Sequence, residues 1–213
     1  MTSILDFHTH RLDATGALIS VDPRHFDPKP GLYYSVGYHP WDDVDRLTDD
    51  DFSLLERCAS HPQVLALGET GMDALRGADL EKQADAFVRH LQLADRLGKP
   101  VVAHNVRTTQ QLLAARRHSK LEHVPLAIHG MRGNAHVARM LLDEGCYLSF
   151  GPRFNAMALR TIPTDRLLIE TDDAEGITID SVAAQIAAAL GQPVESIIAI
   201  ARDNAGRFLS RQQ

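Results

Sequence analysis

The sequence has few cysteines, no excess of positive charge and no long apolar run. Its two cysteines, Cys58 and Cys146, lie in apolar surroundings, where buried and reduced thiols are expected. The 22 basic and 28 acidic residues give a net charge of -6, so the chain has no general attraction for polyanions. No stretch reaches the length of a membrane span, and no membrane partner is expected.

The N-terminus also lacks the basic region and the small-residue cleavage site of a signal peptide. Its first residues have the composition of a β-strand, so a cytoplasmic protein is expected. With 213 residues, of which 44% are hydrophobic and 23% charged, the chain is long enough for one domain with a full core and short for two. We therefore expect a single domain over residues 1–213.

No glycine-rich dinucleotide or phosphate loop follows any apolar run. Short β-branched runs instead alternate with longer amphipathic stretches, an order typical of a parallel sheet flanked by helices. The strands expected from this alternation are residues 3–7, 17–21, 32–38, 64–68, 101–103, 126–128, 147–150 and 167–169. The expected helices are residues 49–60, 79–97, 108–118, 135–144, 179–190 and 194–208.

Eight strands favour a closed (β/α)8 barrel of the TIM type over an open sheet. The barrel is expected to be abbreviated, because the short segment before the third strand contains Pro23, Pro28 and Pro30 and leaves no room for a helix. One crossover helix is therefore expected to be missing near residues 11–31.

The ends of the predicted strands carry imidazole and carboxylate groups, and in such a barrel the active site lies at the C-terminal ends of the strands. His8 and His10 are two positions apart, so in an extended segment both side chains point to one side and can bind the same ion. A lone His-x-His pair indicates little. Here it closes an apolar run and is joined by ligand-type residues at further strand ends, namely His39, Glu69, His104, His129 and Asp172.

Each of these residues has an ordinary and a functional interpretation. Glu69 could cap a helix, but a cation would offset the cost of burying its carboxylate, and its two oxygens could bridge two ions. A lone histidine after a strand is more often a core residue, yet His104 and His129 on adjacent strands could provide the nitrogen ligands of a second ion. Asp172 can ligate a metal and accept the proton of a bound water.

The chemistry of this ligand set restricts the metal. Four histidines with one glutamate and one aspartate suit Zn, Mn, Ni or Fe, and leave Mg less favoured. We therefore expect one or two divalent ions. Neither cysteine follows a strand end with partner ligands, so a thiolate site is not expected.

These motifs, in this order, resemble the TatD family of metal-dependent hydrolases, which are amidohydrolase-like barrels. The resemblance implies that His8, His10, Glu69 and Asp172 hold one ion, that Glu69, His104 and His129 hold a second, and that His39 contacts the substrate. Family members are described as 3′→5′ deoxyribonucleases or phosphodiesterases, and some as deacylases of D-aminoacyl-tRNA. The matching runs are Asp6-Phe7-His8-Thr9-His10, Gly37-Tyr38-His39-Pro40, Gly68-Glu69-Thr70-Gly71-Met72-Asp73, residues 100–107, His129-Gly130, Glu170-Thr171-Asp172 and residues 204–209.

The chain departs from the family pattern around the substrate rather than at the metal ligands. It is shorter than the usual length of about 260 residues, and the missing part lies mainly between His10 and Gly31. Asp173-Ala174 replace the usual Ser-Pro, and residues 130–133 replace Cys-Phe-Ser-Gly. Arginines also follow several strands, where they could bind phosphate oxygens in forked geometry or be solvated surface charges: Arg11, Arg107, Arg132 and Arg153.

The working hypothesis is phosphoester hydrolysis by a metal-activated water. Asp172 would accept the proton, and His39 and the arginines would stabilise charge on the phosphoryl oxygens. The expected substrate is a small phosphoester or a short single-stranded nucleic acid. Three alternatives stay open: an aminoacyl-ester or amide hydrolase, a PHP-type phosphatase, which also begins with His-x-His, and a degenerate metal-binding barrel acting as a non-catalytic partner. The sequence carries no signal for an oligomeric state.

Overall fold

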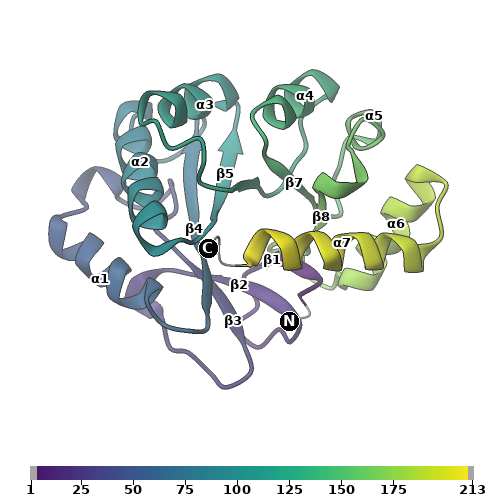
Figure 1. The fold of residues 1–213 in the computed structure, drawn as a ribbon, viewed down its shortest axis with the longest axis horizontal. Helices are drawn as coiled ribbons and strands as arrows, with labels where there is room; N and C mark the ends of the chain where they lie inside the picture. Colours follow the sequence, from purple (N-terminus) through teal and green to yellow (C-terminus); the bar gives the residue numbers. More distant parts are fainter. Residues whose placement is uncertain (1–3, 211–213) are drawn as a thin grey trace.

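Eight parallel strands, hydrogen-bonded in sequence order, form the barrel seen in the computed structural model, which describes residues 4–210 (Figure 1). An isolated bridge between Thr9 and Asp172 joins the first strand to the segment after the last. The predicted barrel is thereby confirmed. The strands are β1 (Asp6–Thr9), β2 (Ala17–Val21), β3 (Tyr33–Val36), β4 (Val64–Asp73), β5 (Val101–Val106), β6 (Leu126–Ile128), β7 (Tyr147–Phe150) and β8 (Leu167–Ile169).

Helices follow the strands from β3 onward and pack around the outside of the barrel (Figure 1). They are α1 (Asp49–Ala59), α2 (Leu80–Leu97), α3 (Thr109–His118), α4 (Ala135–Asp143), α5 (Ala156–Leu159), α6 (Ile179–Leu190) and α7 (Val194–Leu209). Three short 3-10 turns complete the elements: η1 (Pro23–His25), η2 (Val44–Arg46) and η3 (Thr164–Arg166).

The barrel is abbreviated where the sequence predicted it. Residues 11–31 contain β2 and the turn η1 but no α-helix, so neither the connection to β2 nor the one to β3 has a crossover helix. The loop after β2 covers the outer face of the strands instead. The rings of Phe26 and Tyr34 pack edge to face at 5.4 Å, and the N–H of Lys29 donates to the Tyr34 hydroxyl at 3.0 Å.

Several element bounds differ from the prediction. β4 extends to Asp73, and β5 continues to Val106, because the two strands stay paired beyond the predicted ends. The register shifts between Leu67 and Thr70. Gly68 lies there at φ +123°, and a Cβ on it would stand 2.2 Å from the Val102 carbonyl oxygen, so only glycine fits at this position.

The four-residue helix α5 was not predicted, because it is too short to show helical periodicity. Residue 3, with which the first predicted strand begins, lies outside the described residues.

The core has an inner and an outer layer. The inner layer fills the barrel with one small or branched side chain from most strands, such as Leu18, Ala66 and Val102. Phe208 of α7 joins this layer and packs edge to face on Phe7 at 5.3 Å. Helix α7, drawn in yellow in Figure 1, therefore closes the N-terminal end of the barrel and leaves the C-terminal end open.

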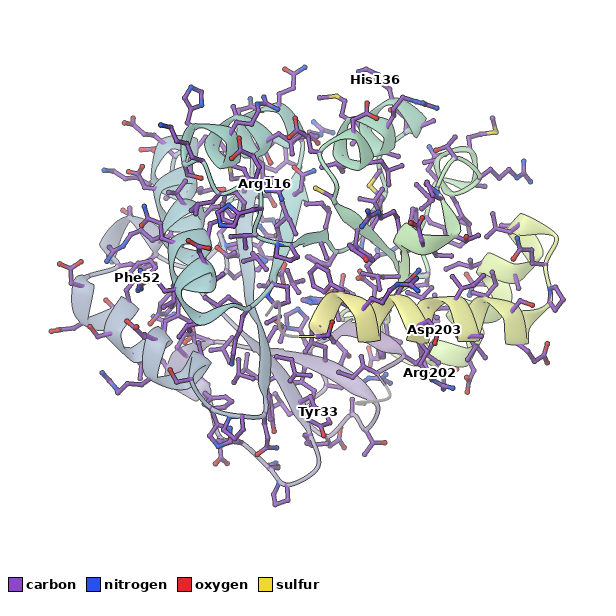
Figure 2. The ribbon with its side chains drawn as sticks, viewed as in Figure 1. Tyr33, Phe52, Arg116, His136, Arg202 and Asp203 are labelled. Carbon is purple, nitrogen blue, oxygen red and sulfur yellow. The ribbon has the colours of Figure 1, made fainter. Side chains whose placement is uncertain are left out.

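Arg116 of α3 is a buried cation that ties together the connections after α3 and α4; it is labelled in Figure 2. Its guanidinium donates to the carbonyl oxygens of Glu144 at 2.9 Å and Val124 at 2.8 Å, and lies 3.8 Å from the Cys146 sulfur. Cys146 is buried and Cys58 half-buried, and both are free. Within residues 4–210, neither cysteine belongs to a cluster of metal-type ligands.

No single helix of the described chain has the length and apolar composition of a membrane span. The pair α6 and α7 meets both criteria only jointly, with a bend of 111° between the two helices.

Candidate metal centre

The carboxylate of Glu69 lies at the centre of the C-terminal end of the barrel, with five histidines around it. Glu69 is only 3% exposed, so this charge is withdrawn from water. Glu69 lies within β4, which continues beyond Gly68 to the C-terminal end of the barrel. The prediction that Glu69 follows its strand was therefore wrong, and so was the same prediction for His8 and His104, which lie within β1 and β5.

The two oxygens of Glu69 divide the histidines into two groups. Oε2 faces β1: it lies 3.1 Å from Nε2 of His8 and 3.4 Å from Nε2 of His10. Oε1 faces the other side, 2.8 Å from Nδ1 of His104 and 2.6 Å from Nε2 of His129. One carboxylate thus stands between two sets of nitrogen atoms.

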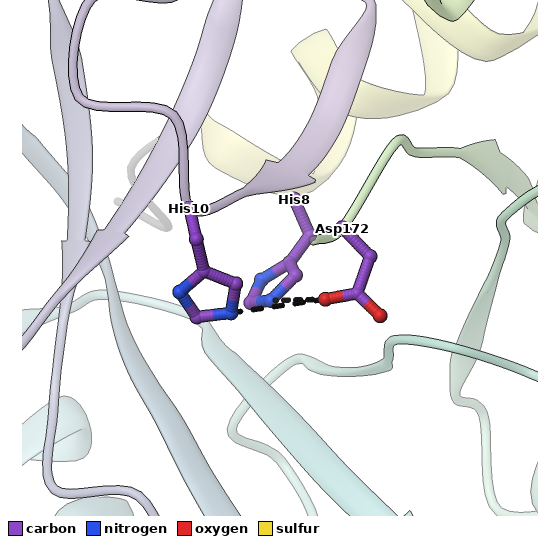
Figure 3. Close-up of side chains that lie close together, drawn as sticks. All are labelled: His8, His10 and Asp172. Atoms are coloured by element: carbon purple, nitrogen blue, oxygen red, sulfur yellow. Dashed lines mark ion pairs between the residues drawn. The ribbon is translucent and has the colours of Figure 1, made fainter. Parts of the chain in front are cut away.

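Asp172 completes the group on the β1 side. Its Oδ1 atom lies 3.8 Å from Nε2 of His8 and 3.7 Å from Nε2 of His10, and Figure 3 shows both imidazoles facing this carboxylate. The backbone of Asp172 adopts φ 54°, a left-handed conformation that few residues other than glycine adopt. Hydrogen bonds to β1 hold it there, including one from the Thr9 hydroxyl to the Asp172 carbonyl at 3.2 Å.

The distances between these donor atoms fit a divalent cation. Ligands about 2.0–2.1 Å from a tetrahedral zinc ion stand about 3.3 Å from one another. The pairs His8–Glu69, His10–Glu69 and His104–His129 are separated by 3.1, 3.4 and 3.2 Å. Four imidazoles and a carboxylate at this spacing form the nitrogen and oxygen donor set that such metals prefer.

Buried polar atoms without a hydrogen-bond partner point to the same use. They include Nδ1 and Nε2 of His8 and Oε2 of Glu69, although such atoms normally find a partner inside a protein. Burial lowers the pKa of His8, which keeps its imidazole neutral and able to ligate a metal. Burial opposes ionisation of Glu69, but the surrounding histidines, His129 foremost, hold its pKa well below the ordinary value. The residues present therefore fit a bound cation.

His39 stands at the edge of this cluster with its tautomer fixed by the backbone. Its Nδ1 accepts a hydrogen bond from the N–H of Trp41 at 3.1 Å, so Nε2 carries the proton. That Nε2 lies 2.9 Å from Oε1 of Glu69, and the side chain is 21% exposed. His39 therefore presents an N–H donor both to the cluster and to the open cavity.

Two buried carboxylates hold the histidines of the Oε1 side from behind. Asp73 Oδ2 lies 3.2 Å from Nε2 of His104, on the ring edge opposite the nitrogen that faces Glu69. Glu170 Oε1 lies 3.5 Å from Nδ1 of His129 and accepts a hydrogen bond from the Gly130 N–H at 2.6 Å. Sequence reasoning assigned no role to Asp73 or Glu170, although both stand in the strand-end motifs.

Arg11 does not belong to the open cavity. Its guanidinium lies 3.3 Å from the buried carboxylate of Asp6 and donates to the Thr171 hydroxyl at 3.2 Å. Burial raises the pKa of Asp6 to about 6, against hydrogen bonds from Thr171 that lower it. This network ties β1 to the segment after β8, so of the two interpretations offered for Arg11 the structure does not favour the phosphate ligand.

The remaining predicted residues meet in one cavity of about 860 Å³ above the cluster. Its wall includes four arginines, and each comes from a different consecutive connection, those after β4, β5, β6 and β7. The loop arginine after β4 was missed, because nothing in the sequence distinguishes it from a surface charge. The lining contains His10, His39, Glu69, His104, His129 and Asp172 with Arg76, Arg107, Arg132 and Arg153.

Comparison with known proteins places this geometry in a family. The profile described as TatD related DNase matches residues 25–210. The uncharacterized metal-dependent hydrolase YabD of Bacillus subtilis is 31% identical over 197 residues, which cover 83% of this chain and 77% of YabD. The protein of Cronobacter turicensis named 3'-5' ssDNA/RNA exonuclease TatD is 34% identical over 153 residues, covering 67% of this chain and 57% of that protein.

The same barrel is found in a solved structure. The Escherichia coli K12 protein YjjV, a TatD homolog, superposes with a TM-score of 0.82 at 21% identity, covering 97% of this chain and 98% of YjjV. Sequence and fold therefore agree, and the chain belongs to the TatD-related DNase family and is a metal-dependent hydrolase of the TatD type.

Proposed function

We propose that the chain hydrolyses phosphoester bonds, in nucleotides or at the ends of short single strands, with two divalent ions held on either side of Glu69. The observation that carries the proposal is the set of four arginines on four consecutive connections, all facing the cavity above the cluster. In a chain with a net charge of -6, this local concentration of guanidinium groups favours an anionic substrate, and the planar fork matches a phosphate.

Each of the two ligand groups would hold one ion in this proposal. His8, His10 and Asp172 would hold one ion with Oε2 of Glu69, and His104 and His129 would hold the other with Oε1. Divalent ions at such a centre lower the pKa of water toward neutrality and neutralise charge on a phosphoryl group.

The chain itself would provide the proton transfer and the orientation. Asp172 faces the cavity at 16% exposure, and its carboxylate would accept the proton of the attacking water. The N–H at Nε2 of His39 would donate to a non-bridging oxygen. Arg132, whose guanidinium lies 3.7 Å from Oδ2 of Asp172, would hold a second oxygen close to the same carboxylate.

The name of the Cronobacter relative supports a nucleic acid as the substrate class. No residue of the abbreviated segment 11–31 is among those that line the cavity. The negative overall charge favours short substrates over long duplex DNA, because few phosphates outside the cavity would meet a cation.

The test compares bond types in one experiment. Purified protein, freed of metal and reloaded with Mn²⁺, Zn²⁺, Ni²⁺ or Mg²⁺, is assayed on bis-p-nitrophenyl phosphate, on an end-labelled single-stranded oligonucleotide and on an aminoacyl ester. We expect metal-dependent release of phosphoester products and little cleavage of the ester. Faster cleavage of the aminoacyl ester would overturn the proposal in favour of a deacylase. No activity with any metal would favour a non-catalytic barrel.

A matched pair of variants tests the arginine wall. Arg132→Ala should raise KM for the oligonucleotide about tenfold or more, because a charge-assisted contact to phosphate is lost. Arg139→Ala, an exposed arginine of α4 that does not line the cavity, is the control and should leave KM unchanged. Equal effects of the two substitutions would contradict the assignment.

A further inference from the structure

Trp41 is an exposed aromatic side chain beside the metal-type cluster. It is 47% exposed and lines the cavity. Its ring centroid lies 4.7 Å from that of His39 and 5.4 Å from that of His104. A single exposed aromatic side chain is ordinary on a protein surface. Trp41 differs in its position, because its ring lies in the wall of the cavity beside the cluster, where aromatic side chains commonly contact ligands.

The indole is fixed in orientation. Its Nε1–H donates to Oδ2 of Asp73 at 2.6 Å, and this same oxygen contacts His104. The guanidinium carbon of Arg76 lies 4.6 Å from the ring centroid, in the range of a cation–π contact. The Arg76 guanidinium thus lies over one face of the Trp41 ring, and we call this pair the Trp41–Arg76 platform.

The loop that carries Arg76 is tied to α2 by hydrogen bonds and lies close against the loop that carries Trp41. The buried amide of Gln83 donates to the carbonyl oxygens of Asp73, Arg76 and Ala78 at 2.7–3.1 Å, and its oxygen accepts from the Asp73 N–H at 2.7 Å. Gly77 has φ +84°, and a Cβ on it would stand 2.0 Å from the Pro40 carbonyl oxygen. The platform is therefore preorganised before any ligand arrives.

We propose that the Trp41–Arg76 platform binds a nucleobase, the one next to the phosphate held over Glu69. Planar bases stack on aromatic rings and on guanidinium planes without regard to sequence, which suits an enzyme that meets any base. The four arginines would hold the phosphate and the platform would hold the ring beside it. This inference rests on the proposed phosphoester function and adds a specificity to it: substrates with a base should bind better than phosphoesters without one.

The chain reports on this site directly, because Trp41 is its only tryptophan. Zinc-loaded protein is titrated with thymidine monophosphate, with deoxyribose 5-phosphate and with thymidine, and tryptophan fluorescence is corrected for absorbed light with free N-acetyltryptophanamide. We expect saturable quenching by thymidine monophosphate, weaker quenching by thymidine and none by deoxyribose 5-phosphate. Quenching by the sugar phosphate equal to that by the nucleotide would overturn the platform, and so would an unchanged signal with the nucleotide.

Variants locate the effect. In equilibrium dialysis with labelled thymidine monophosphate, Trp41→Ala should weaken binding roughly tenfold or more, the range found when a stacking ring is removed. Trp41→Phe should retain most of the affinity. Leu75→Ala, a 60% exposed side chain of the same loop, is the control and should bind as the parent does. Loss of affinity in Trp41→Phe equal to that in Trp41→Ala would show that the hydrogen bond to Asp73, not stacking, is what matters.

Two further outcomes keep this inference separate from the proposed function. Hydrolysis of phosphoesters without base-dependent quenching leaves the function standing and overturns the platform. Base-dependent quenching without phosphoester hydrolysis leaves the platform standing and removes the function. A short oligothymidylate that quenches at a lower concentration than the monophosphate identifies the end of a strand as the ligand, and equal concentrations identify the free nucleotide.

Discussion

The backbone N–H of Asp172 donates a hydrogen bond to the carbonyl oxygen of His8 at 2.9 Å. The first strand and the segment after the last strand are thus fixed to each other at the position where both provide a metal-type ligand. Closing the barrel and assembling the group on the Oε2 side of Glu69 are the same structural event. This explains how residues 164 positions apart reach one site.

Asp172→Asn should lower kcat at least a hundredfold, the scale of a lost general base, while the protein stays folded. The substituted side chain keeps its size and its backbone contacts with β1. The neighbouring Asp173 also lines the cavity, but among the described residues it belongs to none of the clusters of metal-type ligands, so Asp173→Asn is the matched control and should keep kcat within a few-fold of the parent. Steady-state kinetics and circular dichroism measure the two effects. Activity of Asp172→Asn close to the parent would remove the general-base assignment.

Asp73 is a positioning residue for His104, and its replacement should weaken the binding of metal. Asp73→Asn removes the negative charge 3.2 Å from Nε2 of His104, and loss of such a partner weakens metal binding about 10- to 100-fold. Competition with a chelator should show one weakened site and one unchanged site. Asp85→Asn, on the exposed surface of α2, should show two unchanged sites. Equal weakening of both sites would mean that Asp73 supports the loop and not His104.

His90 makes stability depend on pH without touching the metal centre. It is fully buried, accepts a hydrogen bond from the Tyr38 N–H at 3.1 Å and lies 2.7 Å from the Ala86 carbonyl oxygen. Burial lowers the pKa of His90 to about 4 from 6.5. The unfolded chain therefore binds more protons between these values, and the stability present above pH 6.5 is lost as the pH falls toward 4.

The measurement is denaturant unfolding in chelator at about pH 7.5 and about pH 5 for the parent and for His90→Gln. In the parent, His90 should contribute about 2 kcal/mol to the loss of unfolding free energy on this acidification. The variant should start from a lower stability and lose about 2 kcal/mol less. Parallel losses in the two proteins would show that His90 is not responsible.

Phe208 tests whether α7 is needed to close the barrel. It is 2% exposed and contacts the ring of Phe7 at 5.3 Å and that of Tyr147 at 5.2 Å. Phe208→Ala should lower the free energy of unfolding by about 3–5 kcal/mol, as for other buried phenylalanines. Met157→Ala, at a 67% exposed position, should change it by less than about 0.5 kcal/mol. A loss below about 1 kcal/mol for Phe208→Ala would contradict the role of this helix.

The sequence was sufficient for the barrel and for the cluster because both depend on local patterns. Apolar runs followed by ligand-type residues placed His39, His129 and Asp172 beyond strand ends, and the prolines before β3 predicted that the connection between β2 and β3 lacks a helix. The strand bounds near Glu69 could not be predicted, because the extension of β4 depends on its pairing with β5. Local propensity around Gly68 indicates a turn.

Contacts between segments distant in the sequence were the second feature that could not be predicted. Arg11 follows a strand end and was a candidate for the cavity, and Arg76 was not, yet Arg11 pairs with a buried aspartate and Arg76 lines the cavity. The same holds for Asp73, whose partners Trp41 and His104 come from different loops and strands. Only the folded barrel shows which charge meets which neighbour.

The metal content of the loaded protein tests the central claim, a centre in which Glu69 stands between two ions. Elemental analysis after zinc loading and removal of free metal should give two ions per chain for the parent. His8→Ala and His104→Ala should each retain one, because each removes a ligand from one side only. His136→Ala, at an exposed position of α4, should retain two. One ion per chain in the parent would contradict the account. So would the loss of both ions in either single variant.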